Sequence, residues 1–122
     1  MNNPEIRASF ELDATGKPEA ISSGDLQHYR IKLHIEGAPE STYAVTYLLD
    51  PSYRTPTREV LDKENSFEES LTSYGDYTVQ AKIRTPEGIT VIATPLSTAL
   101  RQTYGTAASP QVQSALQLLA SR

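Results

Sequence analysis

The sequence predicts an all-β chain, an antiparallel β-sandwich that ends in a short C-terminal α-helix. Its 122 residues suit one hydrophobic core. Six or seven short runs alternate apolar and polar side chains, which is the pattern of strands with one buried face and is typical of antiparallel sheets. Apolar residues at helical spacing occur near the C terminus. We therefore expect a sandwich at residues 3–97, a linker at 98–108 and a helix at 109–121.

The first half of the chain contains three expected strands. Alternation at residues 6–13 predicts the first strand, and the Gly, Pro and Ser content of residues 14–24 is typical of a loop. Residues 26–36 show the clearest alternation in the chain. The glycine and proline at 37–41 form a short turn, so we expect residues 26–36 to pair as a hairpin with the strand at 43–50.

The second half continues the sandwich with shorter runs. Residues 57–61 are expected to form a short edge strand, because the prolines before them prevent a longer one. The runs at 78–84 and 89–95 alternate again. The sequence TPEG at 85–88 between them predicts a hairpin turn in which Gly88 supplies a positive φ.

The C-terminal residues differ in character from the rest. Small and polar residues at 98–108 are typical of a linker, and Ser109 followed by Pro110 is a strong helix start. The apolar residues that follow are at helical spacing: Val112, Ala115, Leu116 and Leu119. A helix of about 12 residues is marginal alone and has to dock. A sheet edge, a second copy of the chain in a homo-oligomer and a further region all remain open as its partner.

Bulk properties exclude several classes of function. A net charge of −4 argues against nucleic-acid binding, which requires a basic face. The chain has no cysteine, which excludes disulfides and thiolate chemistry and fits a reducing compartment. No apolar run approaches the roughly 20 residues that span a bilayer, and the first residues lack a secretory pattern. We expect a cytoplasmic protein without membrane contact.

Residues for catalysis or metal binding do not assemble in the sequence. His28 and His34 would lie about 20 Å apart on one strand, too far to share a metal. No G-x-S-x-G motif or phosphate-binding loop is present. An acidic cluster lacks the glycine and spacing of a calcium loop: Asp62, Glu64, Glu68 and Glu69. We therefore expect no metal, no cofactor and no enzymatic activity.

The tyrosines carry the most specific functional signal. Tyr53, Tyr74 and Tyr77 lie in or beside two loops that adjoin the strands at 43–50 and 78–84, and in one sandwich these loops emerge at the same end. One interpretation is that the rings pack as core and capping residues. The other is that they form an aromatic pocket, because tyrosine faces suit planar or cationic groups.

The chain resembles the YEATS domain family, more closely its prokaryotic YEATS-like branch. The sequence VTYLLDPSY at 45–53 is similar to the strand-to-loop motif of the family, and TPTR at 55–58 to the proline-containing arm that follows it. SYGDY at 73–77 is similar to the later aromatic motif. The spacer at 60–70 and the His-Tyr pair at 28–29 also match, so the resemblance covers about residues 26–96.

This resemblance implies an immunoglobulin-like sandwich, whose eukaryotic members read acylated lysine between aromatic rings. It implies Tyr53 and Tyr74 as stacking walls, Ser52 as a hydroxyl partner for the ligand amide and Tyr77 as the pocket floor, with His28 peripheral. The full expected set of ligand-binding residues is His28, Asp50, Ser52, Tyr53, Ser73, Tyr74, Gly75 and Tyr77.

Two residues depart from the family pattern. Asp50 stands where the family usually has histidine, and Ser73 replaces the usual glycine. A carboxylate beside an aromatic slot favours a cation over a neutral amide. We predict a noncatalytic recognition module for a protein, a peptide with modified or free lysine, or a small polar ligand. The alternative is a structural or adaptor domain that contacts proteins through an edge strand or the C-terminal helix.

Overall fold

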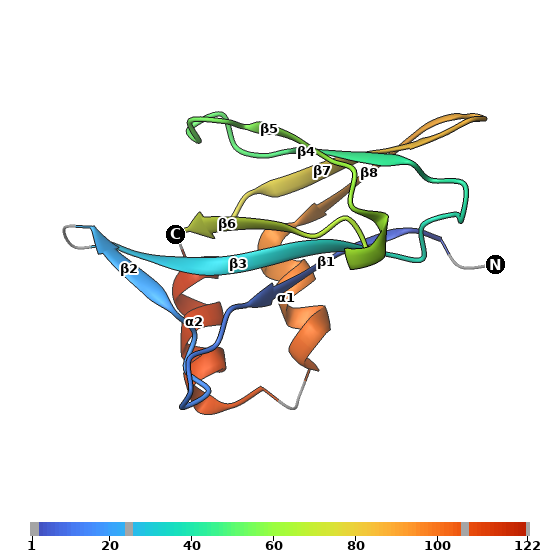
Figure 1. Ribbon diagram of the computed structural model, residues 1–122. Coiled ribbons are helices and arrows are strands. Elements are labelled where there is room, and N and C mark those ends of the chain that lie inside the picture. Colours follow the sequence, from blue (N-terminus) through green and yellow to red (C-terminus); the bar gives the residue numbers. More distant parts are fainter. Residues whose placement is uncertain (1–2, 24–25, 106–107, 122) are drawn as a thin grey trace.

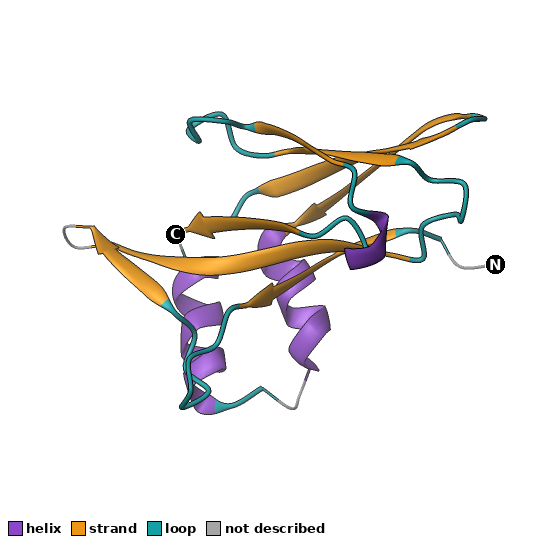
Figure 2. Ribbon diagram, viewed as in Figure 1, coloured by secondary structure: helices purple, strands orange, loops and turns teal. Residues whose placement is uncertain are grey.

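Two antiparallel sheets face each other, and two helices lie along one side of them (Figures 1 and 2). The computed structural model describes residues 3–23, 26–105 and 108–121. Elements follow one another in the order β1 (Glu5–Phe10), β2 (Ala20–Ser23), β3 (Leu26–Glu36), β4 (Ala44–Leu48), β5 (Thr57–Val60), the 3-10 turn η1 (Lys63–Asn65), β6 (Glu69–Ser73), β7 (Thr78–Thr85), β8 (Gly88–Pro95), α1 (Leu96–Tyr104) and α2 (Pro110–Ala120). The expected sandwich is confirmed.

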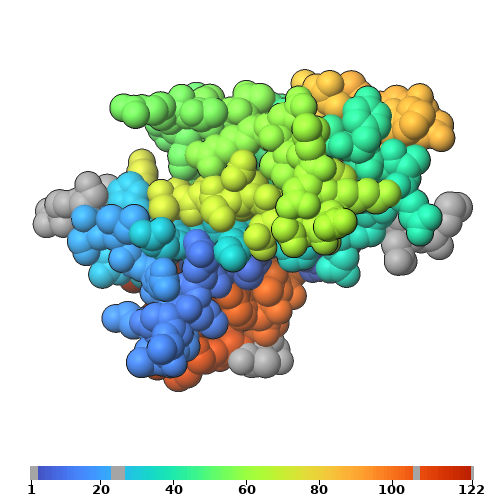
Figure 3. Space-filling model, viewed as in Figure 1, coloured from blue at the N-terminus to red at the C-terminus, as the bar shows by residue number. Residues whose placement is uncertain are grey.

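The two sheets differ in strand order. One consists of β5, β4, β7 and β8 in that order. In the other, β3 is central: β6 pairs with one of its edges, and β1 and β2 pair with different lengths of it, β1 with residues 31–36 and β2 with residues 26–29. The connection from β5 to β6 crosses from one sheet to the other on the face shown in Figure 3.

The core lies between the sheets and extends into the helices. Alternate residues of β3 are buried, as the sequence predicts: Tyr29, Ile31, Leu33 and Ile35. Tyr47 of β4 is fully buried, and its hydroxyl donates to the Phe67 carbonyl at 2.7 Å. Burial raises the pKa of Tyr47, so this hydroxyl remains a donor.

Side chains from other elements cover two strand edges. On β1, the Thr103 hydroxyl of α1 donates to the Ala8 carbonyl, and the Tyr104 hydroxyl accepts the Phe10 N–H at 2.9 Å. On β6, Arg58 donates to the Ser70 carbonyl at 2.8 Å. The hydroxyl of Tyr53, from the loop between β4 and β5, donates to the Thr72 carbonyl. An open edge offers backbone groups to other chains, and these bonds remove that opportunity on β1 and β6.

The expected hairpin between residues 26–36 and 43–50 is wrong. β3 and β4 lie in different sheets, and the chain crosses between them at residues 37–43. Gly37 adopts a φ of 78° where the chain leaves β3. Alternation identifies the buried face of a strand but not its partner, and both strands bury their apolar faces in the same core from opposite sides.

The linker expected at residues 98–108 is also wrong, because most of that range is helical. α1 runs from Leu96 to Tyr104 and begins before the expected end of the sandwich at residue 97. Leu96, Ala99 and Leu100 are fully buried and belong to the same core as the sheets. The sequence at 14–24, expected to be a loop, likewise contains the four-residue strand β2.

The C-terminal helix begins where the sequence indicates. Ser109 is its N-cap and accepts the Val112 N–H at 3.3 Å, with Pro110 in the first turn. Its apolar stripe is buried within the chain: Val112, Ala115, Leu116 and Leu119. This stripe is therefore not exposed for pairing with a second copy of the chain, so it cannot form the interface of the homo-oligomer considered above.

β8 presents apolar side chains to solvent. Ile89 and Val91 are 58% and 55% exposed and lie opposite Arg84 and Lys82 on the outer face of their sheet. Inner positions of β8 carry Ile92, which packs against the core. Among the described residues, no helix has the length and apolarity needed to cross a membrane.

Removing a core side chain from α2 tests whether the helix belongs to the fold. We expect Leu119→Ala to lower the free energy of unfolding by roughly 2–5 kcal/mol, because Leu119 is fully buried and the truncation leaves a cavity. Leu118→Ala is the matched control, since Leu118 is 38% exposed on the same helix. Urea denaturation of both variants measures the difference, and equal small losses would show that α2 is not docked.

Candidate functional site

One end of the sandwich contains a cavity of about 400 Å³ between the β4–β5 loop, the β6–β7 loop and the start of β3. Its lining residues are His28, Asp50, Ser52, Tyr53, Arg54, Thr72, Ser73, Tyr74, Gly75, Asp76 and Tyr77. All eight residues expected from the sequence lie on this wall; that they bind a ligand remains a prediction. Arg54, Thr72 and Asp76 were missed, although each directly adjoins an expected residue.

A chain of hydrogen bonds fixes two of the tyrosines. The Tyr77 hydroxyl donates to the Tyr53 hydroxyl at 3.0 Å, and the Tyr53 hydroxyl donates to the Thr72 carbonyl at 2.7 Å. The rings meet edge to face, with centroids 5.7 Å apart and planes at 63°. Burial, followed by the Tyr53 bond, raises the pKa of Tyr77, so its hydroxyl stays a donor. These two rings form a rigid part of the wall.

Tyr74 belongs to a separate aromatic pair. Its ring lies 5.2 Å from the His28 ring at 62°, because β3 and β6 are paired in a register that places His28 beside Tyr74. Tyr74 is 44% exposed. Among the described aromatic contacts, Tyr53 pairs with Tyr77 and Tyr74 with His28, and the two pairs lie on the wall of one cavity.

Asp50 supplies a carboxylate to the wall. Its Oδ1 accepts the Ser52 N–H at 2.9 Å, which closes a tight turn after β4. This backbone bond, and then the Ser52 hydroxyl, hold the pKa of Asp50 below its usual value, so the group is ionised at neutral pH. Asp50 therefore contributes both to the loop conformation and to negative charge at the cavity.

Ser73 directs its hydroxyl into the β6–β7 loop. The Ser73 Oγ donates to the Gly75 carbonyl at 2.7 Å, and the side chain is buried. Ser73 thus stabilises the turn that carries Tyr74. Its hydroxyl is engaged by the backbone of Gly75 within the loop.

Asp76 connects the cavity wall to the helices. Its carboxylate accepts the Ser97 N–H at 2.9 Å and the Ser97 hydroxyl at 2.6 Å, at the first turn of α1. A carboxylate there satisfies an unpaired helical N–H and faces the positive end of the helix dipole. The loop that holds Tyr74 is therefore fixed to α1.

Arginines add positive charge near the tyrosines. Arg54 lines the cavity, and the Arg58 guanidinium lies 5.7 Å from the centroid of the Tyr53 ring. The cavity wall therefore carries both signs of charge, with Asp50 and Asp76 against Arg54. Both carboxylate oxygens of Asp76 accept bonds from Ser97, whereas Asp50 accepts the Ser52 N–H at Oδ1.

The wall does not assemble a catalytic set among the described residues. Among the described residues of the wall, His28 is the one imidazole, and its ring contacts the Tyr74 ring. A nucleophile needs a base within hydrogen-bond reach. Nor do three His, Asp or Glu side chains gather to hold a metal ion anywhere in the ranges that the structure describes.

The fold and the site together are a β-sandwich with an aromatic-lined cavity at one loop end. The chain belongs to the prokaryotic YEATS domain family, whose model matches residues 29–94. The matched region runs from β3 to β8 and includes all of the cavity wall except His28.

Solved structures with a similar fold include YEATS domains of Yaf9. "The Yaf9 YEATS domain Recognizing H3K122suc Peptide" has a TM-score of 0.54 and 16% identity, and the match covers 77% of this chain and 74% of that one. The yeast AF-9 homolog protein Yaf9 gives 0.54 and 17%, covering 76% and 69%. The Yaf9 YEATS domain bound to H3K27ac gives 0.52 and 16%, covering 79% and 74%. At these identities the likeness shows the fold, and no curated protein matches the sequence.

The Asp50 turn predicts an acid-range titration. In the NMR spectrum, the Asp50 carboxyl should titrate below its usual pKa of 3.8. Ser52→Ala should raise this pKa only partway, because the backbone N–H bond remains while the hydroxyl is lost. A lowered pKa stabilises the folded state above the unfolded value, so this contribution is lost as pH falls below about 3.8 through the folded pKa.

Asp13 provides the control for that titration. Its pKa is also lowered, mainly by the Thr15 hydroxyl and backbone amides, in a loop between β1 and β2. Ser52→Ala should leave the Asp13 midpoint unchanged. An Asp50 midpoint at or above 3.8 in the parent chain would contradict the turn described here.

Proposed function

We propose that the domain is a noncatalytic peptide-recognition module whose aromatic cavity receives a lysine side chain. The observation that carries the proposal is the convergence of Tyr53, Tyr74 and Tyr77 with an ionised Asp50 around one cavity. Its volume of about 400 Å³ lies within the roughly 300–1,000 Å³ typical of ligand pockets. Family membership and the peptide complexes of Yaf9 support a peptide as the partner.

The division of the wall suggests how the side chain would bind. Tyr53 and Tyr77 are held by their hydroxyl chain, so they lose little conformational freedom when a ligand arrives. Tyr74 is partly exposed and offers a ring surface on the opposite pair. An aliphatic lysine stem suits such rings, and its ammonium group suits both their faces and a carboxylate.

Asp50 distinguishes this pocket from one for a neutral acyl amide. An ionised carboxylate on the wall attracts an ammonium group, whereas a neutral acyl amide gains no charge–charge attraction from it. We therefore propose free lysine as the preferred form. The test compares peptides that differ only in acylation of one lysine.

NMR titration of matched free-lysine and acetyl-lysine peptides should show the parent chain preferring the free amine. Asp50→Asn keeps an acceptor for the Ser52 N–H and should weaken free-lysine binding by about two- to fivefold, in line with an exposed ion pair. Asp50→His should shift the preference toward the acylated peptide. Added salt should reduce the difference between the parent and Asp50→Asn.

Two tyrosine substitutions, one in the cavity and one elsewhere, test where the peptide binds. Tyr74→Ala should abolish the perturbations at the loop end, whereas Tyr43→Ala, which removes a ring that is 57% exposed elsewhere, should not. If neither peptide perturbs the amides of residues 50, 52–54 and 73–77 in the parent or in Asp50→His, the pocket does not bind lysine. A stronger response of the parent to acetyl-lysine would overturn the role of Asp50.

An adaptor function is the second candidate, and the edge strand β8 favours it. Ile89 and Val91 expose apolar surface on that strand, while the stripe of α2 is buried. Replacing both residues by threonine would abolish partner binding in an adaptor and leave lysine binding unchanged. The two candidates are thereby distinguishable with the same peptide titration.

A further inference from the structure

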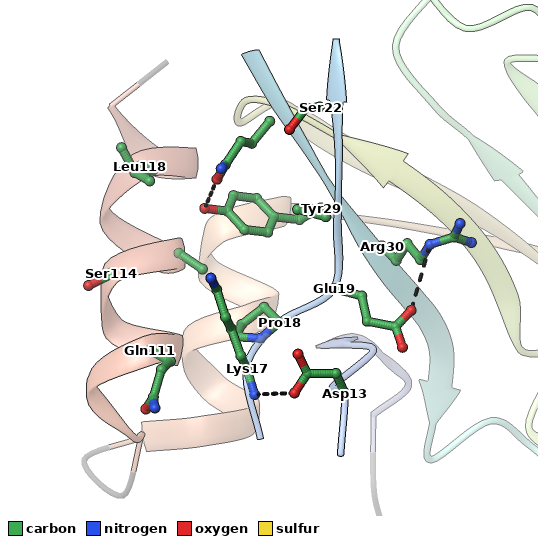
Figure 4. A pocket seen from close by; sticks show the side chains of 13 residues that line it. Asp13, Lys17, Pro18, Glu19, Ser22, Tyr29, Arg30, Gln111, Ser114 and Leu118 are labelled. Atoms are coloured by element: carbon green, nitrogen blue, oxygen red, sulfur yellow. Dashed lines mark hydrogen bonds and ion pairs between the residues drawn. The ribbon is translucent and has the colours of Figure 1, made fainter. Parts of the chain in front are cut away.

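A second cavity lies on the other side of β3, between β2 and α2 (Figure 4). Its volume is about 750 Å³, larger than the aromatic cavity, and the two cavities share no lining residue. The buried ring of Tyr29 lies between the strand and the helix and forms its floor. We name this space the β2–α2 groove.

An open strand edge borders the groove. Among the described strands, β2 pairs with β3 alone. The Arg30 N–H donates to the Glu19 carbonyl at 3.0 Å, which shows that the backbone of Glu19 faces β3. In an antiparallel pair every second residue bonds the neighbouring strand, so Ile21 also faces β3. The N–H and C=O groups of Ala20 and Ser22 therefore point away from β3. Both of these residues line the groove.

The β2 edge differs from the two edges that the chain covers. Helix side chains bond the backbone of β1, and arginine and tyrosine bond that of β6. Within residues 3–23, 26–105 and 108–121, no hydrogen bond from outside the sheet reaches the backbone of Ala20 or Ser22. An uncovered edge of this kind is a template for an added strand.

The opposite wall is a helical face that would contact such a strand. Residues of α2 at i, i+3, i+4 and i+7 line the groove: Gln111, Ser114, Ala115 and Leu118. These side chains are small or uncharged, so they leave room and add no repulsion. An extended peptide between a strand edge and a helix gains backbone hydrogen bonds on one side and side-chain contacts on the other.

The charge in the groove indicates what the peptide carries. Lys17 points along α2 toward the Tyr29 hydroxyl, and its ammonium group makes no hydrogen bond or ion pair with the described residues. The Asp13 carboxylate accepts the Thr15 hydroxyl, the Thr15 N–H and the Lys17 N–H, so its bonds are local. Arg30 is paired with Glu19 at 3.7 Å, and Figure 4 shows both on the side of β2 away from α2. Lys17 is thus the cation of the groove that makes no ion pair with the described residues, and its charge also helps to lower the pKa of Asp13.

We propose that the β2–α2 groove binds an extended peptide of a partner protein, which adds as a strand to Ala20 and Ser22 and places a carboxylate against Lys17. β2 has four residues, so the paired stretch is short, about 13 Å at ~3.3 Å per residue. The proposal does not rest on lysine binding at the aromatic cavity. Each cavity can be tested with the other disabled.

The experiment selects random linear peptides with free C termini from a display library against the Tyr74→Ala chain, in which the aromatic cavity is disabled. Enriched peptides are then synthesised and titrated into the isotopically labelled parent chain. We expect the enriched sequences to carry Asp, Glu or the terminal carboxylate at a fixed position. We also expect the amides of Ala20 and Ser22 to gain protection from hydrogen exchange when the peptide is bound.

Two matched pairs of variants locate the binding. Lys17→Glu should weaken the selected peptide roughly fivefold or more, whereas Lys82→Glu, a charge reversal on the outer face of the other sheet, should not. Ser114→Trp fills the groove and should cost about tenfold or more. Gln117→Trp is its control, since both positions are exposed on α2 and only Ser114 lines the groove.

The outcomes separate cleanly. The proposal is supported if the selected peptides are acidic, protect the amides of Ala20 and Ser22 from hydrogen exchange, and bind more weakly to Ser114→Trp. The proposal is overturned if the selection enriches no sequence, if the enriched peptides tolerate Lys17→Glu, or if they protect the amides of β8 and ignore Ser114→Trp. Lysine-peptide binding by the parent should be unchanged in Lys17→Glu, so failure of one site does not imply failure of the other.

Discussion

Backbone groups along the edges of the two sheets need partners, and side chains from α1, β5 and the β4–β5 loop supply them on β1 and β6. Tyr53 illustrates it, because its hydroxyl bonds the Thr72 carbonyl on the edge of β6 while accepting a bond from Tyr77. The bond that closes a strand edge is therefore the same bond that orients a ring of the aromatic cavity. Loss of edge coverage and loss of the cavity wall would occur together.

Helix α1 provides the same coverage for the edge of β1. Thr103 and Tyr104 satisfy the backbone of β1, and Asp76 holds the first turn of α1 from the loop beside Tyr74. The loop end and the helices are thus mechanically connected through one carboxylate. The core is continuous from the sheets into α1 and α2 because buried apolar side chains of both helices, such as Leu100 and Leu119, belong to the same cluster as the strands, so residue 97 does not separate two units.

The sequence predicts those elements whose signals are local. The bounds of β3 follow from its clean alternation, and Ser109 with Pro110 identifies the start of α2. α1 was missed because its start signal is not local: Pro95 precedes the helix, and the carboxylate that accepts the Ser97 N–H belongs to Asp76, 21 positions before Ser97. The pairing of strands could not be predicted either, because alternation defines the buried face of a strand, whereas tertiary packing determines the sheet to which it belongs.

Successive residues at the start of β3 face different cavities: His28 lines the aromatic cavity, while Gln27 and Tyr29 line the β2–α2 groove. Point substitutions can therefore change one cavity and leave the other intact. Insertion or deletion of one residue in this stretch would instead exchange the two sets of side chains and alter both cavities at once. Over evolutionary time, the two surfaces can diverge in chemistry independently, but the length of this stretch is common to both.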